Sequence, residues 1–139
     1  MIFAENATDG LRTGQIKEKL AQSLHNRNLK KVLLVPPDIT RLNSGAGLIT
    51  ALYYDLLRGV HVDILPATGT HRLMDAVEKR AFFGAEIPSA CYLDHHWRGG
   101  VAKIGEVPAD FVREVSDGRM DMAMDVEVSD GCIFKKCMR

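Results

Sequence analysis

The sequence predicts an α/β domain with a mostly parallel sheet. Residues 31–35 and 60–65 are short apolar or β-branched runs, and the first shows no polar alternation, as in strands that helices cover on both faces. Between them, residues 48–57 repeat apolar side chains at helical spacing up to Gly59. A strand, a helix and a strand in this order form a right-handed βαβ unit. We therefore expect a three-layer, Rossmann-like arrangement, and 139 residues are enough for one domain.

A helix is expected before this unit. Thr13 is a suitable cap for a helix that runs to about Asn26, and Ser44 is a suitable cap for the helix that ends at Gly59. One side of the first helix is apolar, and we expect this stripe to lie in the core. The stripe consists of Ile16, Leu20, Ala21 and Leu24.

Further elements are expected after the second strand. Residues 71–83 predict a third helix that ends at Gly84, with Thr70 as the simplest cap. Residues 90–93 predict a third parallel strand. Beyond residue 100 we expect a strand at 101–107, a helix at 109–115 and a half-buried strand in which Met120, Met122, Met124, Val126 and Val128 alternate mostly with acidic residues.

The composition argues against several classes of partner. Lys and Arg total 18, as do Asp and Glu, so the net charge is zero and no basic stripe marks a nucleic-acid surface. The apolar runs are too short for a membrane span, and the first residues do not resemble a signal peptide. Three cysteines without a disulfide spacing favour a reducing, cytoplasmic compartment. The pair Cys132 and Cys137 is only a weak metal signal, so we expect ordinary thiols.

Polar residues follow each predicted strand. Because parallel strands end at the same edge of a sheet, these residues should meet at one rim, where open α/β sheets bind ligands. They are Asp38 and Arg41 after the first strand, His71 and Arg72 after the second, and Asp94, His95 and His96 after the third.

This predicted rim suits proton transfer on a small anionic substrate. An arginine offers a fork of donors to a carboxylate or phosphate, and a histidine exchanges a proton near neutral pH. Asp38 could orient Arg41 or His71 through a charged hydrogen bond. A surface cluster of ion pairs explains the same composition about equally well.

Other site chemistries have weaker signals. Gly45 and Gly47, ahead of a helix, could present amides to a phosphate or could simply permit a tight turn. Asp94, His95 and His96 offer metal ligands, but neighbouring side chains in a strand diverge, which disfavours one shared metal. The sequence contains no nucleophile elbow, phosphate-binding P-loop or HExxH motif.

Two segments resemble motifs of the lactate racemase family, the nickel-pincer nucleotide enzymes, and more closely those of their uncharacterised relatives. They are Pro37-Asp38-Ile39-Thr40-Arg41 and Gly69-Thr70-His71-Arg72, and Glu78 and Phe83-Gly84 follow as in the family. The resemblance spans about residues 31–98 and continues more weakly to about residue 128.

The resemblance implies interconversion of the two hands of a 2-hydroxy acid. In the family, the cofactor takes a hydride from the α-carbon and returns it to the opposite face, while two histidines act as acid and base on the substrate hydroxyl. By resemblance, His71 is the first of these histidines, Arg41 holds the substrate, and Asp38 is the neighbour of Arg41 in the active site. Arg72 and the Asp94–His95 pair are further candidates, although the family has His-Asp where this chain has His95-His96.

The resemblance also implies that residues 1–139 are a single, incomplete N-terminal domain. The second catalytic histidine, the lysine that anchors the cofactor and the nickel-ligating histidine lie further along the chain in the family. Lys135 and Lys136 follow no family motif and are not assigned to the anchor. We therefore expect this chain to bind no cofactor or metal and to be inactive alone.

Two other functions are compatible with the residues. One is a non-catalytic module that binds phosphate or carboxylate through Arg41, Arg72 and the Gly45–Gly47 turn; the other is a small metal-dependent hydrolase. The hydrolase would use His71, Asp94, His95 and His96. In every case a short parallel sheet leaves an unpaired edge, which predicts a homo-oligomer or marginal stability.

Overall fold

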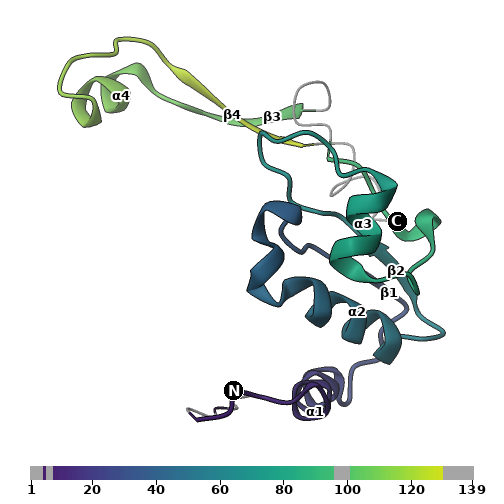
Figure 1. Ribbon diagram of the computed structural model, residues 1–139. Coiled ribbons are helices and arrows are strands. Elements are labelled where there is room, and N and C mark those ends of the chain that lie inside the picture. Colours follow the sequence, from purple (N-terminus) through teal and green to yellow (C-terminus); the bar gives the residue numbers. More distant parts are fainter. Residues whose placement is uncertain (1–4, 6–7, 96–100, 130–139) are drawn as a thin grey trace. The chain divides into compact units, whose positions relative to one another are not determined.

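The computed structural model describes residue 5, residues 8–95 and residues 101–129, and it forms two compact units, Met1–Asp94 and His95–Arg139 (Figure 1). The first unit contains α1 (Thr13–Leu24), β1 (Lys31–Leu34), the 3₁₀ helix η1 (Ile39–Ser44), α2 (Ala46–Leu56), β2 (His61–Ile64), α3 (Ala76–Phe83) and the 3₁₀ helix η2 (Ser89–Cys91). The second contains β3 (Val101–Val107), α4 (Ala109–Val115) and β4 (Met124–Ser129). The mixture of helices and strands confirms the α/β class. Within the described ranges, no helix has the length and apolar character that a membrane crossing requires.

The βαβ unit is present as predicted. β1 and β2 pair in parallel, with Lys31 opposite His61 and Leu34 opposite Ile64. The pairing extends beyond the strands to a parallel bridge between Pro37 and Ala67. The chain segments after β1 and β2 therefore leave the sheet at the same edge, which is the geometry on which the predicted site depends.

The predicted third strand is mostly wrong. Residues 89–91 form η2, and only Tyr92 bridges Ile64 in parallel, supported by the Leu93 N–H that donates to the Ile64 carbonyl at 2.8 Å. The N–H groups of Cys91 and Tyr92 donate to the carbonyls of Pro88 and Ser89, so they are not available for a sheet ladder. The expected direction is correct, but the strand is reduced to one bridge.

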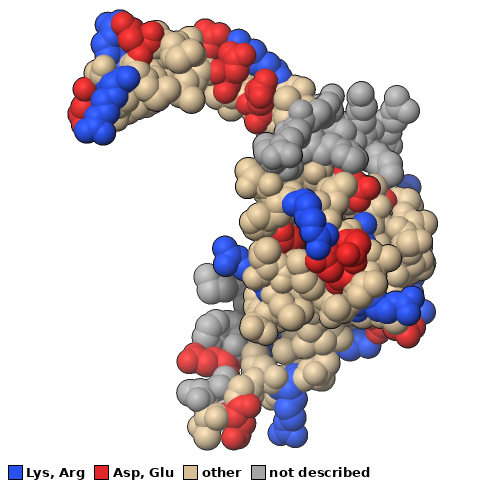
Figure 2. All heavy atoms as spheres, turned by 45° about the horizontal axis from the view of Figure 1, so that its top comes forward, with Lys and Arg blue, Asp and Glu red and all other residues tan. Residues whose placement is uncertain are grey.

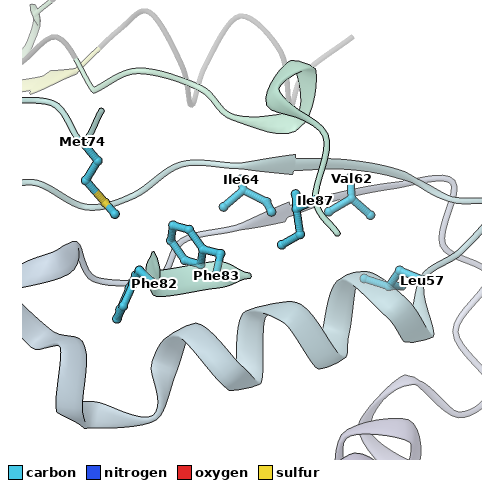
Figure 3. Close-up of a cluster of buried hydrophobic side chains, with 7 residues drawn as sticks. All are labelled: Leu57, Val62, Ile64, Met74, Phe82, Phe83 and Ile87. Atoms are coloured by element: carbon cyan, nitrogen blue, oxygen red, sulfur yellow. The ribbon is translucent and has the colours of Figure 1, made fainter. Parts of the chain in front are cut away.

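The core of the first unit lies between the sheet, α2 and α3 (Figure 3). The edge-to-face pair of Phe82 and Phe83 has its ring centroids 4.7 Å apart. Each fully buried apolar side chain contributes roughly 1.5–3 kcal/mol to folding, so this cluster is the main source of stability in the unit. Its members are Leu57, Val62, Ile64, Met74, Phe82, Phe83 and Ile87.

The prediction that α1 buries its apolar stripe in the core is wrong. No residue of α1 is buried, Ala21 is exposed, and only Leu24 of the stripe packs against the core cluster. Polar contacts hold α1 to α2 instead: Lys17 Nζ lies 2.6 Å from Asp55 Oδ2, and Ser23 Oγ lies 2.9 Å from Tyr53 Oη. Helical periodicity identified the inward face but not how deeply it is buried.

Three helix starts differ from the predicted caps. The N-cap of α1 is Arg12 rather than Thr13, and that of α2 is Gly45, which adopts a left-handed φ of 75°, although Ser44 Oγ accepts from the Ala46 N–H. α3 begins at Ala76, well after the predicted His71, and Thr70 is not its cap.

A capping box explains the late start of α3. The side chain of Asp75 accepts hydrogen bonds from the N–H groups of Val77 and Glu78, both at 2.9 Å. The Glu78 carboxylate in turn accepts from the Asp75 N–H at 3.0 Å. The residues between β2 and Asp75, including His71, are therefore free to form the loop at the edge of the sheet.

The second unit is a strand, a helix and a strand in antiparallel pairing. The predicted strand at 101–107 and the helix at 109–115 are both confirmed. β3 pairs with β4 from Val101 opposite Ser129 to Val107 opposite Met124. The last strand starts at Met124, and its apolar residues Met124 and Val126 are exposed rather than half-buried. This part of the prediction is wrong, because the described residues of the unit leave both side chains exposed.

Charged side chains of both signs are interspersed on the face shown in Figure 2. This distribution agrees with the equal totals of 18 basic and 18 acidic residues.

Candidate functional site

Asp38 and His71 meet where β1 and β2 end. The Nδ1 atom of His71 lies 2.8 Å from Oδ2 of Asp38. The bridge between Pro37 and Ala67 sets this distance, because Asp38 and Thr68 follow it side by side. A turn then brings His71 back: its N–H donates to the Thr68 carbonyl at 2.9 Å, and Gly69 adopts the left-handed φ of 57° that the turn requires. Two residues far apart in the sequence thus form one hydrogen-bonded pair.

Asp38 is a buried carboxylate with three hydrogen-bond donors. It caps η1, accepting at Oδ1 from the Thr40 N–H at 3.0 Å and the Thr40 hydroxyl at 2.5 Å, while Oδ2 faces His71. Burial by itself raises the pKa of Asp38, but the hydrogen bonds from Thr40 and His71 outweigh it and lower the pKa below its ordinary value. Asp38 is therefore ionised at neutral pH.

The charge of Asp38 fixes the state of the His71 ring. An ionised carboxylate only accepts hydrogen bonds, so Nδ1 of His71 carries the hydrogen and donates it. In neutral imidazole, Nε2 then holds the lone pair. The side chain of His71 is 57% exposed, and Nε2 has no partner among the residues that the structure describes. Nε2 is thus placed to take a proton from a bound molecule.

Arg41 is an exposed cation close in the chain to this pair. It lies on η1, and its N–H donates to the Asp38 carbonyl at 3.1 Å. Its φ and ψ of −106° and 35° interrupt the regular 3₁₀ geometry. Within the described ranges, its guanidinium makes no hydrogen bond or ion pair. Its donors are therefore available to a carboxylate or phosphate.

Arg72, in contrast, is engaged within the protein. Its guanidinium makes a bidentate contact with Glu78, at 2.6 and 3.0 Å, and donates to the Leu73 carbonyl at 3.1 Å. These bonds brace the loop against the start of α3. The predicted role of Arg72 in substrate binding stays a prediction, and it would require exchange of Glu78 for the substrate.

Of the proposed second cluster, Asp94 and His95 lie within the described residues. Asp94 pairs with Lys79 of α3, whose Nζ is 3.4 Å away. His95 belongs to the second unit, and His96 lies outside the described residues. A role for Asp94 and His95 stays a prediction.

The structure also bears on the metal and cysteine interpretations. No group of three His, Cys, Asp or Glu side chains within residues 8–95 and 101–129 could hold a metal ion. Cys91 is a free thiol whose Sγ lies 3.9 Å from Tyr54 Oη, whereas Cys132 and Cys137 fall outside the described residues.

The two glycines before α2 have structural roles. Gly45 supplies the left-handed N-cap, and Gly47 lets α2 approach α3, since a Cβ on Gly47 would overlap the carbonyl oxygen of Phe82. This contact accounts for Gly47 without a phosphate.

Sequence reasoning missed the residues that support the pair. Thr40 and the buried Thr68 were not proposed, although Asp-x-Thr is the pattern in which an aspartate caps a turn two residues on. The Asp75–Glu78 box was also present in the sequence as Asp-x-x-Glu, an acidic counterpart of the usual capping signature.

Comparison with known proteins agrees with this picture. Residues 6–136 match the family described as the lactate racemase N-terminal domain. No curated protein matches the chain. Among solved structures, a crystal structure of a Thermotoga maritima protein is similar, with a TM-score of 0.77 and 29% sequence identity. The similarity covers 91% of this chain and 31% of that protein, so the chain spans about a third of its length.

Proposed function

Because the chain belongs to the lactate racemase N-terminal domain family, we propose that it forms the N-terminal part of a 2-hydroxy acid racemase or epimerase. The observation that carries the proposal is the 2.8 Å contact between His71 Nδ1 and Asp38 Oδ2. A histidine so oriented by a carboxylate is an acid/base group, and the resemblance assigns that role to His71.

The chemistry of His71 follows from its tautomer. In a complete enzyme of the family, Nε2 would accept the proton of the substrate hydroxyl while the α-hydrogen leaves as hydride to the cofactor, and it would return that proton when the hydride comes back to the α-carbon. Asp38 stays ionised and stabilises the imidazolium that forms. Thr40 keeps the carboxylate in place through its N–H and hydroxyl.

Arg41 is the preferred group for holding the substrate carboxylate. Its guanidinium is unengaged by the described residues, whereas that of Arg72 is paired with Glu78. A bidentate contact from Arg41 would fix the substrate with its hydroxyl toward Nε2. A small 2-hydroxy acid anion such as lactate is the substrate class this arrangement suits.

We assign no residue of this chain to the nickel-pincer nucleotide of the family. By resemblance, the lysine that anchors it and the histidine that ligates nickel lie further along the chain in the family. The proposal is therefore that hydride chemistry requires residues beyond this chain and that the chain alone does not racemise.

The first test is binding of lactate followed by NMR. The ¹⁵N shifts of His71 should show a protonated Nδ1 and an unprotonated Nε2, and lactate should perturb Nε2. Arg41→Ala should abolish this response, whereas Arg80→Ala, which removes an exposed arginine of α3, should preserve it. An identical response in both variants would contradict the assigned role of Arg41.

The second test is catalysis in a complete enzyme. Residues 6–136 would replace the corresponding segment of a family racemase loaded with its cofactor. We expect lactate racemisation that His71→Asn lowers by roughly 10²–10⁴-fold. His25→Asn, at an exposed histidine that caps the C-terminus of α1, is the control and should retain activity. Full activity of the His71 variant would refute the proposal.

A second candidate function, anion binding without catalysis, rests on the same unengaged Arg41. It predicts that phosphate and lactate bind equally well and that His71→Asn does not change the lactate affinity. Calorimetry with both anions separates the two functions, because a racemase site should prefer lactate and should respond to His71.

A further inference from the structure

The loop that carries His71 is anchored at both ends. Its first end is the bridge that follows β2, where the Ala67 N–H donates to the Pro36 carbonyl at 2.8 Å. Its second end is Asp75, the N-cap of α3. Residues 71–75 belong to no helix or strand, so contacts other than a regular ladder must hold the backbone on the far side of His71.

Arg72 and Glu78 supply such a contact. The guanidinium donates to the Glu78 carboxylate through both terminal nitrogens, at 2.6 and 3.0 Å, and also to the Leu73 carbonyl at 3.1 Å. The same carboxylate accepts from the Asp75 N–H at 3.0 Å. Glu78 therefore joins the loop to the first turn of α3 through hydrogen bonds from both the side chain of Arg72 and the backbone of Asp75.

The geometry of this contact differs from that of an ordinary surface ion pair. A single exposed pair contributes little to stability, because solvent screens it and holding two long side chains costs entropy. Here two nitrogens of the planar guanidinium donate to two different oxygens of the carboxylate, which fixes direction as well as distance. The side chain of Glu78 is only 23% exposed, and its bond to the Asp75 N–H restrains it further. Arg72 is thus held at a defined place relative to α3.

His71 depends on this contact because it lies directly before Arg72. Its N–H is held by the Thr68 carbonyl at 2.9 Å and the next residue is held by Glu78, so the backbone on both sides of the imidazole is restrained. The side chain of His71 is 57% exposed, so packing does little to set the direction of its ring. A functional side chain must stay within about 0.5 Å of its working geometry. The direction of the ring toward Asp38 therefore depends on the restraint of the backbone.

The buried Met74 is a second anchor of the same segment. Its side chain is 5% exposed and belongs to the core, so it fixes the chain three residues after His71. Arg72 and Leu73 lie between these two points, and each residue adds two soft backbone dihedrals. Met74 therefore limits how far the loop can move but does not fix the peptide next to His71.

We propose that Arg72 and Glu78 are positioning residues for His71. Their bidentate contact holds the loop in the conformation in which Nδ1 of His71 donates to Asp38 and Nε2 is presented to a bound molecule. The inference rests on the proposed acid/base function of His71, and it gives Arg72 a role different from substrate binding. Both residues act through His71 and neither touches the substrate.

The first test observes the ring of His71 in the isolated chain through its ¹⁵N shifts. The unaltered chain should show a protonated Nδ1 and an unprotonated Nε2. Arg72→Lys keeps the charge but loses the planar fork, whereas Glu78→Gln keeps an acceptor for the Asp75 N–H but loses the ion pair. Each variant should move both ring shifts toward the averaged values of a mobile imidazole that exchanges its two tautomers.

A control variant and an unfolding measurement complete this test. Arg58→Lys makes the same change at an arginine whose Nε lies 2.9 Å from Asp55 Oδ1, and it should leave the ring of His71 unchanged. Thermal unfolding of the same variants separates positioning from stability, because a purely structural role would lower the unfolding midpoint and leave the ring shifts of the folded protein as they are. Unchanged ring shifts in both Arg72→Lys and Glu78→Gln would overturn the proposal.

The second test is kinetics in the chimeric racemase that carries residues 6–136. Arg72→Lys should lower kcat roughly 10–100-fold and leave KM within about two-fold, since a misplaced base slows the chemistry without removing a substrate contact. Adding Glu78→Gln should lower kcat no further, because both changes remove the same contact. A raised KM with unchanged kcat would show that Arg72 binds the substrate and would refute the positioning role. An inactive unaltered chimera would count against the racemase function instead, and the ring shifts of the isolated chain test the positioning role without it.

Discussion

The contact between α2 and α3 makes a sharp prediction about Gly47. A Cβ built at this position overlaps the Phe82 carbonyl oxygen and lies 2.9 Å from the carbonyl carbon and 3.3 Å from Cδ2 of the ring. The atoms in the way are mainly backbone, so no side-chain rotation relieves the overlap. Gly47→Ala must therefore push the two helices apart.

The cost can be estimated from that geometry. The limiting contact is with the Phe82 carbonyl oxygen, and a Cβ essentially never comes within about 3 Å of another atom, so this oxygen must retreat by at least about 1 Å. Overpacking of this kind costs about 1–3 kcal/mol, and separation of α3 would also loosen the buried Phe82 and Phe83. Replacing a helical glycine by alanine returns at most about 1 kcal/mol. We expect a net loss of about 2 kcal/mol, or roughly 8 °C in the unfolding midpoint.

Thermal and urea unfolding would measure this loss, with Gly14→Ala as the matched control. Gly14 is also helical, but a Cβ there meets nothing within 4 Å. The control should be as stable as the unaltered chain or slightly more stable. Equal stability of the two variants would show that the close approach of α2 and α3 is not a constraint, and the structural explanation of Gly47 would fail.

Two further substitutions test the site and its supporting helix. Asp38→Asn should lower stability at pH 7 by about 1.5–3 kcal/mol, since it removes charged hydrogen bonds. Folding lowers the pKa of Asp38, so the stability that its carboxylate contributes is fully present above the ordinary pKa near 4 and is lost as the pH falls through the folded pKa. Measured from pH 7 down to pH 2, the unfolding free energies of the unaltered chain and of Asp38→Asn should therefore converge. A difference in unfolding free energy that stays constant with pH would contradict the pKa argument. Asp75→Ala should lower the free energy of unfolding by about 1 kcal/mol, measured in urea, because it removes the N-cap of α3. The control is Asp110→Ala, which lies in the first turn of α4 but is not its N-cap and should cost less than about half of that. Equal losses in the two variants would refute the capping role of Asp75.

The elements predicted best are those whose signal is local and redundant. Residues 31–35 and 60–65 contain consecutive apolar residues, and a helix of suitable length lies between them. This order predicted the parallel pairing of β1 and β2 that the structure has. The start of α3 failed because Leu73 and Met74 continue the helical apolar spacing. In the structure Met74 belongs to the loop before α3, yet its side chain is buried in the core. The capping box at Asp75 determines where the helix begins.

For the candidate site, the sequence predicted the positions of residues but not their side-chain partners. Strand order was enough to place Asp38 and His71 at one edge, because that geometry depends on topology alone. Topology does not determine side-chain partners, and so the pairing of Arg72 with Glu78 could not be anticipated. The predicted third strand does not form because the N–H groups of Cys91 and Tyr92 donate to the carbonyls of Pro88 and Ser89 within η2, and a sheet would need the same N–H groups.

The prolines after β1 explain why the pair at the rim is held by the sheet rather than by a loop. The Pro36 carbonyl accepts from the Ala67 N–H at 2.8 Å, so the parallel pairing continues to the residues just before Asp38 and Thr68. Pro37 has no N–H with which to continue a strand ladder, and the chain turns into η1 with Asp38 as its cap. The carboxylate is consequently fixed by strand pairing on one side and by Thr40 on the other. His71 needs only a single turn to reach it, which makes the acid/base geometry a direct consequence of where the two strands end.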